Sequence, residues 1–153
     1  MQVSVAPARN RQLDDIAEGL PQRAAALSRL FLTRTSVSVS RTEAGVIWAL
    51  AERPRRITEL AAREGVTQPG ITRLVNRLVA DGWVTREGDP CDGRAVMVRL
   101  TPEGREVFDT LRAEYRSLVH DEMAALADED VETLARAVDV LDALIARLQE
   151  RDA

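Results

Sequence analysis

The stretch GVTQPGITRLVNRLVADGWVTREGDPCDGRAVMVRLTPEG, residues 65–104, decides the fold. Its first part places apolar residues at helical spacing. Thr67 is of the type that caps a helix N-terminus, and Pro69 suits the first turn of a helix. Gly82 stands where such a helix would end, because glycine readily adopts the left-handed conformation that follows a helix. A helix is therefore predicted over 68–80.

Alternating apolar and polar residues follow this helix and indicate a β-hairpin. A period of two is typical of strands that are buried on one face. Residues 83–87 and 95–100 show this period. The connector over 88–94 is polar and contains glycine and proline, so a hairpin with a long tip is predicted.

Two further helices are predicted just before this region. Residues 40–43, Ser-Arg-Thr-Glu, form a capping box that opens a helix ending before Pro54. A second helix is predicted over 58–64, with Gly65 as its C-terminal cap. Three residues separate it from the helix over 68–80, which is the pattern of a helix-turn-helix. With the hairpin added, the predicted fold class is mainly α (α+β), a winged helix-turn-helix.

The last helix of this motif carries side chains suited to reading DNA. Its predicted core positions are Ile71, Leu74, Val75 and Leu78. The opposite face offers Thr, Gln, Asn and Arg, which hydrogen-bond to base edges and phosphates. The full set predicted to contact DNA is Thr67, Gln68, Pro69, Gly70, Thr72, Arg73, Asn76 and Arg77. Within that set, direct readout is assigned to Gln68, Pro69, Thr72 and Arg73, and phosphate binding to Arg77.

The hairpin tip carries a second predicted DNA contact. Arg94 is placed to enter a narrow minor groove, whose negative potential attracts guanidinium groups. Asp92 stands two residues earlier, where a carboxylate would otherwise repel phosphate. We interpret Asp92 as the group that orients Arg94.

Apolar stripes at helical spacing flank the winged segment. One runs from Leu13 to Phe31, and Pro21 within it predicts a kink or a fresh helix start. The other runs from Val131 to Leu148 with spacings of 3, 4, 3, 4 and 3 residues, a heptad pattern. Such stripes favour burial in a helical interface rather than exposure to water. The residues predicted to form that interface are Leu13, Ile16, Leu20, Val131, Leu134, Val138, Leu141, Ile145 and Leu148.

The predicted organisation has four parts. They are a loose N-terminal tail over 1–9, an N-terminal dimerisation helix over 10–35, the winged lobe over 36–104 and C-terminal dimerisation helices over 105–153. The charge is divided in a similar way, because residues 107–153 hold five Arg against twelve acidic residues, a net −7, whereas the whole chain carries −4. The remainder is mildly basic, which leaves room for a local DNA-binding patch.

The winged segment resembles the MarR family of bacterial transcriptional regulators. The family pattern in the wing is Asp-Pro-x-Asp-x-Arg, followed after a strand by Leu-Thr-x-x-Gly. This chain carries that pattern as Asp89, Pro90, Asp92, Arg94, Leu100, Thr101 and Gly104. The preceding helix adds the family-like Thr67, Thr72-Arg73-Leu74 and Arg77-Leu78.

The resemblance implies a homodimer that regulates transcription by binding double-stranded DNA. Two recognition helices about 34–36 Å apart would read a pseudo-palindromic operator. Members of the family commonly repress nearby genes and release DNA when a small molecule arrives. The family binds such effectors between its lobes, and Phe31, Trp48 and Arg112 are the predicted pocket residues here.

Composition and missing motifs exclude several other classes. The chain has 153 residues, 45% hydrophobic and 30% charged, as is typical of globular proteins. It has neither an apolar run of membrane-spanning length nor a signal-peptide pattern, so a cytoplasmic location is expected. Without a glycine-rich phosphate loop or a nucleophile–base pair, the chain is predicted not to be an enzyme and to need no cofactor or metal.

Two alternatives to a ligand-responsive DNA-binding regulator stay open. Cys91 in the wing would make a thiol- or oxidant-sensing switch, although the neighbouring carboxylates disfavour its thiolate. Alternatively, the winged helix would serve only as a protein-interaction module without DNA binding.

A few isolated residues receive modest interpretations. His120 is the single histidine and is interpreted as an exposed or interface residue rather than a metal ligand. Arg55 and Arg56 are interpreted either as phosphate contacts or as solvated loop residues.

Overall fold

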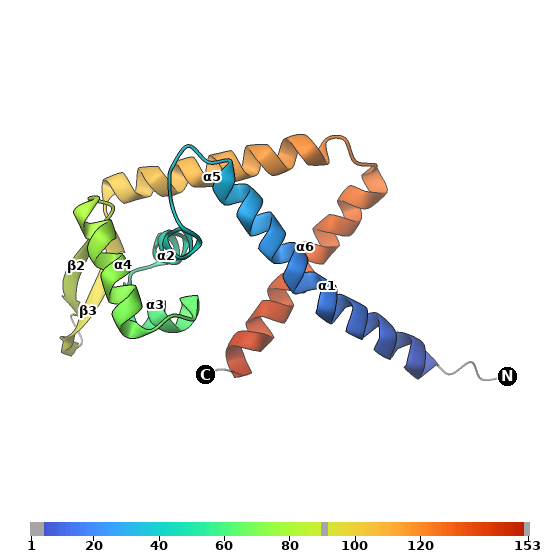
Figure 1. Cartoon of the computed structure of the whole chain (residues 1–153), viewed down its shortest axis with the longest axis horizontal. Coiled ribbons are helices and arrows are strands. Elements are labelled where there is room, and N and C mark those ends of the chain that lie inside the picture. Colours follow the sequence, from blue (N-terminus) through green and yellow to red (C-terminus); the bar gives the residue numbers. More distant parts are fainter. Residues whose placement is uncertain (1–4, 90–91, 152–153) are drawn as a thin grey trace. The chain divides into compact units, whose positions relative to one another are not determined.

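The computed structural model describes residues 5–89 and 92–151, with side chains described over 8–88 and 96–151. The elements are α1 (Val5–Thr33), α2 (Arg41–Glu52), β1 (Arg55–Arg56), α3 (Ile57–Glu64), α4 (Gln68–Ala80), β2 (Val84–Asp89), β3 (Asp92–Leu100), α5 (Pro102–Met123) and α6 (Asp128–Arg151) (Figure 1). The chain forms two compact units, which divide between Tyr115 and Arg116 within α5. The predicted class, mainly helical with a small antiparallel sheet, is confirmed.

The capping box at the start of α2 is confirmed. The backbone N–H of Glu43 donates to the Ser40 hydroxyl oxygen at 3.3 Å. In return, the Glu43 carboxylate accepts from the backbone N–H of Ser40 at 2.7 Å. These bonds satisfy amides that the first turn of a helix leaves without partners, so the sequence defines where α2 begins.

The turn between α3 and α4 also forms as predicted. Gly65 caps α3 in the left-handed region at φ 64°. The Thr67 hydroxyl then accepts from the backbone N–H of Gly70 at 3.3 Å and caps α4. Gly82 follows α4 with φ 77°. Both glycines occupy conformations that cost other residues free energy, which is why the turn chemistry could be read from sequence.

The sheet has the strand order β1-β3-β2, with both pairings antiparallel. Strands β2 and β3 extend beyond the predicted ranges and pair as far as Asp89 with Asp92, so the tip is shorter than expected. The polar composition of 88–94 favoured a loop, but the pairing of β2 with β3 continues over Gly88 with Val96 and Asp89 with Asp92. Strand β1, where Arg55 and Arg56 pair with Val98 and Met97, was not predicted because two residues show no period.

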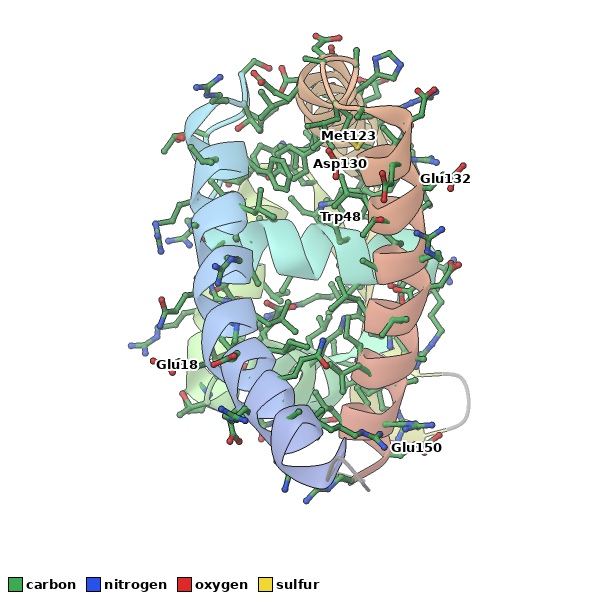
Figure 2. The ribbon with its side chains drawn as sticks, turned by 90° about the vertical axis from the view of Figure 1, so that its right-hand side faces the viewer. Glu18, Trp48, Met123, Asp130, Glu132 and Glu150 are labelled. Carbon is green, nitrogen blue, oxygen red and sulfur yellow. The ribbon has the colours of Figure 1, made fainter. Side chains whose placement is uncertain are left out.

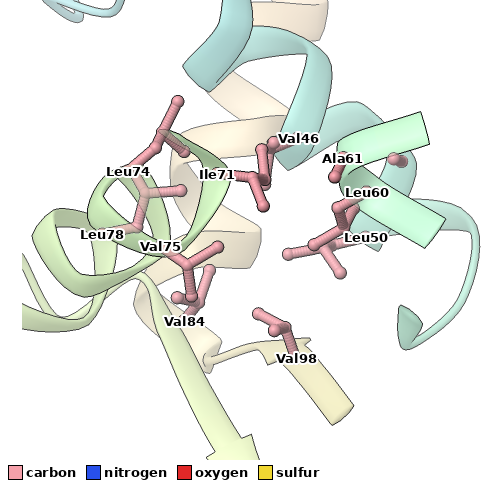
Figure 3. Packing of buried hydrophobic residues seen from close by; sticks show 11 residues of the cluster. Val46, Leu50, Leu60, Ala61, Ile71, Leu74, Val75, Leu78, Val84 and Val98 are labelled. Atoms are coloured by element: carbon pink, nitrogen blue, oxygen red, sulfur yellow. The ribbon is translucent and has the colours of Figure 1, made fainter. Parts of the chain in front are cut away.

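The elements of the winged segment share one hydrophobic core. Aliphatic side chains from α2, α3, α4 and the hairpin meet in it (Figure 3). Leu60, Ile71 and Leu78 are completely buried. Burying a side chain of this kind stabilises a fold by roughly 1.5–3 kcal/mol. This core fixes α4 against the sheet and determines which of its faces stays outside.

The Leu-Thr-x-x-Gly segment joins the sheet to α5. The Thr101 hydroxyl donates to the carbonyl oxygen of Gly82 at 2.6 Å and accepts from the backbone N–H of Gly104 at 3.0 Å. A Cβ atom at Gly104 would lie 1.9 Å from the carbonyl oxygen of Trp83. Only glycine therefore permits the start of α5 to approach the backbone between α4 and β2 this closely.

Helix α1 differs from its prediction. It begins at Val5, so residues 5–9 are helical instead of part of a loose tail, and it ends at Thr33. Pro7 falls in the first turn, where a missing N–H is tolerated. Pro21 lies inside α1, and no new helix starts there. The proline removes one backbone hydrogen bond, which the rest of a 29-residue helix accommodates.

The second unit contains the end of α5 and all of α6. No described residue of α6 is buried. Its acidic face includes Glu132 and Glu150 (Figure 2). On the predicted heptad stripe, Val138 is 57% exposed and Ile145 is 49% exposed, whereas Leu141 is half-buried.

Candidate nucleic-acid interface

The face of α4 that points away from the core carries polar and basic side chains. The predicted inward positions Ile71, Leu74, Val75 and Leu78 are all buried. Gln68, Arg73 and Asn76 are exposed as a consequence of the helical period. The helical period of the sequence therefore predicts the buried face of this helix correctly.

Two shallow grooves flank the exposed face of α4. The first has a volume of about 480 Å³ and the second of about 430 Å³. The first is lined by Gln68, Pro69, Thr72 and Arg73, and the second by Ser40, Thr42, Val66, Gly70, Arg73, Leu74 and Arg77. Arg73 lines both. The hydroxyls of Ser40 and Thr42 extend this polar surface onto the start of α2, which the sequence analysis did not anticipate.

Arg77 is held by an acidic partner on α2. Its Nε donates to Glu43 Oε1 at 2.7 Å, and its Nη2 lies 2.6 Å from the same oxygen. The Glu43 residue is 9% exposed, whereas the Arg77 side chain is 60% exposed. Burial alone would raise the pKa of Glu43, but hydrogen bonds with Ser40 and the Arg77 charge outweigh it and lower that pKa. Glu43 therefore stays ionised, caps α2 and ties α4 to α2.

A hydrogen bond also connects the hairpin to α4. Arg86 on β2 donates from Nη2 to the carbonyl oxygen of Thr72 at 3.3 Å. The Thr72 hydroxyl itself donates to the carbonyl oxygen of Gln68 at 2.8 Å. Neither bond could be predicted from the local sequence. Fourteen residues separate Arg86 from Thr72. A serine or threonine within a helix donates to the carbonyl oxygen four residues earlier only in some contexts.

The wing residues are placed only in part. Asp92 and Arg94 lie in β3, but their side chains are outside the part of the chain that the structure describes. Cys91 lies outside the described residues altogether. The roles assigned to these three residues stay predictions.

Arg55 has a structural role instead of the predicted phosphate contact or free solvation. Its side chain is 12% exposed and forms ion pairs with Glu52 and Glu59. Its Nε donates to the carbonyl oxygen of Ala49 at 3.1 Å. Arg63 also pairs with Glu52, at 2.9 Å. This network fastens β1 between α2 and α3.

A separate cavity of about 230 Å³ lies within the first unit. It is lined by Ser28, Phe31 and Leu32 of α1, Arg41, Ala44, Gly45 and Trp48 of α2, Glu64 of α3 and Tyr115 of α5. Two of the predicted pocket residues, Phe31 and Trp48, are present (Trp48 is labelled in Figure 2). Arg112 is exposed on α5 and is not among the residues that line this cavity.

The remaining candidate sites are weak. His120 is exposed, and its Nδ1 lies 3.6 Å from Asp121 Oδ1. Across the described residues, no three His, Cys, Asp or Glu side chains are grouped to hold a metal ion. Among the helices described, none is both long and apolar enough to span a bilayer.

Comparison with known proteins agrees with this geometry. A family model described as the MarR family matches residues 37–95, which run from just before α2 into the first part of β3. The transcriptional regulator BldR of Sulfolobus solfataricus has a structure that superposes with a TM-score of 0.68 at 30% identity, over 96% of this chain and 99% of that one. The chain belongs to the MarR family. Its relatives are transcriptional regulators, so this MarR-family protein is a winged-helix transcriptional regulator and not an enzyme.

Two other relatives show how far the likeness extends. An uncharacterised HTH-type transcriptional regulator of Mycobacterium bovis is 33% identical over 86 residues, covering 56% of this chain and 60% of the relative. This match thus spans less than two thirds of that relative's length. A mutant form of E. coli MarR, solved in complex with operator DNA, superposes with a TM-score of 0.64 at 22% identity, over 85% of this chain and 95% of that one. At that identity the likeness concerns the fold.

Proposed function

We propose that this protein is a homodimeric repressor that binds a pseudo-palindromic operator and is released by a small molecule. The observation that carries the proposal is the polar, groove-flanked face of α4, held in place by Glu43 and Arg86. An isolated structural helix has no need for a rigid outward row of amide, hydroxyl and guanidinium groups. That the E. coli relative binds operator DNA with the same fold supports this interpretation.

The DNA contacts follow from this face. Gln68, Thr72 and Arg73 would meet base edges in the major groove, with Thr67, Pro69, Gly70 and Asn76 around them. Arg77 would bind phosphate with the part of its guanidinium that Glu43 leaves open. Arg94, oriented by Asp92, would enter the minor groove from the wing. Because the Glu43 carboxylate offsets part of the Arg77 charge, we expect Arg73 to contribute more to affinity than Arg77.

Dimerisation would use the exposed apolar stripes. Leu13 and Ile16 on α1 are 52% and 53% exposed. Together with Val138 and Ile145 on α6, they leave more apolar surface in water than a stable monomer normally does. A second copy of the chain provides the same stripes, and a two-fold dimer then presents two α4 helices to successive turns of DNA.

Repression and release complete the proposal. A dimer seated on an operator that overlaps a promoter excludes RNA polymerase. The cavity between α1, α2, α3 and α5 is the place where a small molecule would act, since it adjoins both the arm helix α1 and the winged segment.

A fluorescence-anisotropy titration tests the DNA-binding part. The protein is titrated onto duplexes from upstream of its own gene and onto a scrambled duplex, each at two salt concentrations. We expect preference for the upstream duplex and an affinity that falls with salt. Arg73→Ala should weaken binding by about 1–3 kcal/mol, whereas the exposed Arg136→Ala on α6 should leave it unchanged. Weak, equal binding to both duplexes would instead favour a protein-interaction module.

A further inference from the structure

Glu64 places a half-buried carboxylate in the wall of the cavity, where its oxygens stay open to solvent. It makes no hydrogen bond or ion pair over the described part of the chain, although the charges of Arg63 and Arg41 attract it. Arg63 is engaged by Glu52 at 2.9 Å, and Arg41 is exposed. Burial raises the pKa of the Glu64 carboxyl, against the opposing attraction of these two arginines.

The backbone of α2 makes room for this carboxylate. A Cβ atom at Gly45 would lie 2.3 Å from one Glu64 carboxylate oxygen. Glycine at this position therefore lets Glu64 lie against α2 and reach the cavity. Ala44 and Gly45 form a small-residue floor there.

Aromatic rings form another part of the cavity wall. The chain holds two Trp, one Tyr and two Phe, so four of its five aromatic residues gather in this cluster. Tyr115 stacks on Phe31 with ring centroids 4.8 Å apart and on Trp48 at 6.3 Å. Phe108 supports Trp48 edge-on at 4.9 Å. Phe108 and Trp48 also pack in a second hydrophobic cluster with Ile47 and Leu111, apart from the aliphatic winged core.

These features select a particular ligand chemistry. A half-buried carboxylate favours a cation that donates hydrogen bonds to it, and aromatic faces attract both rings and cations. A cavity of about 150 Å³ holds benzene, so about 230 Å³ accepts one ring with a short side chain. An aromatic acid would bring a second negative charge beside Glu64, whereas the charge of Arg41, which also lines the cavity, is exposed to solvent and screened by it.

We propose that the cavity binds a single-ring aromatic amine, whose ammonium donates to Glu64 while its ring packs on Trp48 and Tyr115. Ligand binding in the cavity does not depend on the proposed function. Only its consequence, the release of DNA, rests on that function. Glu64 is the last residue of α3, and α4 begins four residues later at Gln68. A ligand that draws Glu64 toward the aromatic wall therefore acts at the base of the turn that positions α4.

The test compares two probes of equal shape and opposite charge on the full-length protein without DNA. Isothermal titration calorimetry is run with phenethylamine and with 3-phenylpropanoate. We expect phenethylamine to bind roughly tenfold or more tightly than 3-phenylpropanoate. Glu64→Gln should weaken phenethylamine binding by a similar factor, and the exposed Glu106→Gln on α5 should not change it.

Three results of this calorimetric test would overturn the proposal. The proposal is overturned if 3-phenylpropanoate binds as tightly as phenethylamine, if neither probe binds up to its solubility limit, or if folded Glu64→Gln retains full affinity. Should Glu64→Gln fail to fold, the charge comparison on the unchanged protein still decides. Since no DNA is present, absence of operator binding in the anisotropy assay would refute the proposed function without affecting this result.

Discussion

The winged segment buries its apolar side chains, whereas the arms, helices α1 and α6, leave theirs exposed. In the winged segment, every predicted inward side chain of α4 is buried, and Leu60, Ile71 and Leu78 are completely covered. In α6, no described residue is buried, although its heptad stripe is as regular as any pattern in the chain. A periodic apolar stripe thus predicts a helix in both places, but only the surrounding elements determine whether the chain covers that stripe itself.

The two regions therefore have different structural roles. The winged segment completes its own core and holds α4 rigid toward the outside. The arms leave apolar surface uncovered, which a second copy can cover. Substitutions in the first region should therefore affect folding, and substitutions in the second should affect association.

The largest expected effect is in the winged core. Leu78→Ala leaves a cavity in a fully buried site and should lower the free energy of unfolding by about 2–5 kcal/mol. Urea denaturation followed by circular dichroism measures it. Leu126→Ala, at a site 42% exposed, is the control and should change it by less than about 0.5 kcal/mol. Equal effects at the two sites would remove the contrast.

The arms are tested by association. Val138→Asp places a charge on the predicted interface and should weaken the dimer by about a hundredfold or more, because that carboxylate would be buried without a partner. Sedimentation equilibrium at several concentrations measures the constant. Val140→Asp is the matched control, since Val140 is 66% exposed and lies off the heptad stripe. If both variants dimerise like the unchanged protein, another surface forms the dimer.

A substitution in the wing should affect DNA binding and not dimerisation. Arg94→Ala should cost about 1–3 kcal/mol of DNA binding and leave the dimer intact, because a minor-groove arginine contributes no contact between subunits. Anisotropy on the upstream duplex and sedimentation on free protein separate the two effects. Unchanged DNA affinity would show that the wing does not contact DNA.

The smallest effect concerns the tie between α2 and α4. Glu43→Gln removes the charge that pairs with Arg77 and should lower stability at neutral pH by about 1 kcal/mol. The pKa of Glu43 is lowered in the folded protein, so its contribution is present above the unfolded value near 4.5 and is lost as the pH falls through the folded pKa. Thermal unfolding between about pH 3 and about pH 7 should show a shallower acid loss in Glu43→Gln. Parallel pH profiles for the two proteins would contradict this role.

Local chemistry explains which parts of the structure were predictable. The Ser40–Glu43 capping box, Gly65 and Thr67 act within four residues of sequence, so they defined α2, α3 and α4 correctly. The inward face of α4 followed from helical period alone. These features also placed the candidate DNA-contacting side chains on one exposed face.

Features that depend on distant neighbours were not predictable. Strand β1 exists only because β3 lies beside it, and the largely covered Arg55 pairs with Glu52 and Glu59. Glu64 resembled an ordinary solvated residue in the sequence, and its cavity forms only when α1, α2, α3 and α5 meet. Arg112 does not line this cavity, whereas Tyr115, one helical turn further along α5, does.

The number of chains on one operator tests the central claim most directly. Sedimentation velocity of the protein with a fluorescent duplex carrying the preferred upstream sequence gives the mass of the saturated complex. The division of labour between arms and winged segment predicts two chains per duplex, with the complex lost in Val138→Asp and retained in Val140→Asp. A saturated complex with one chain per duplex, unaffected by Val138→Asp, would contradict it.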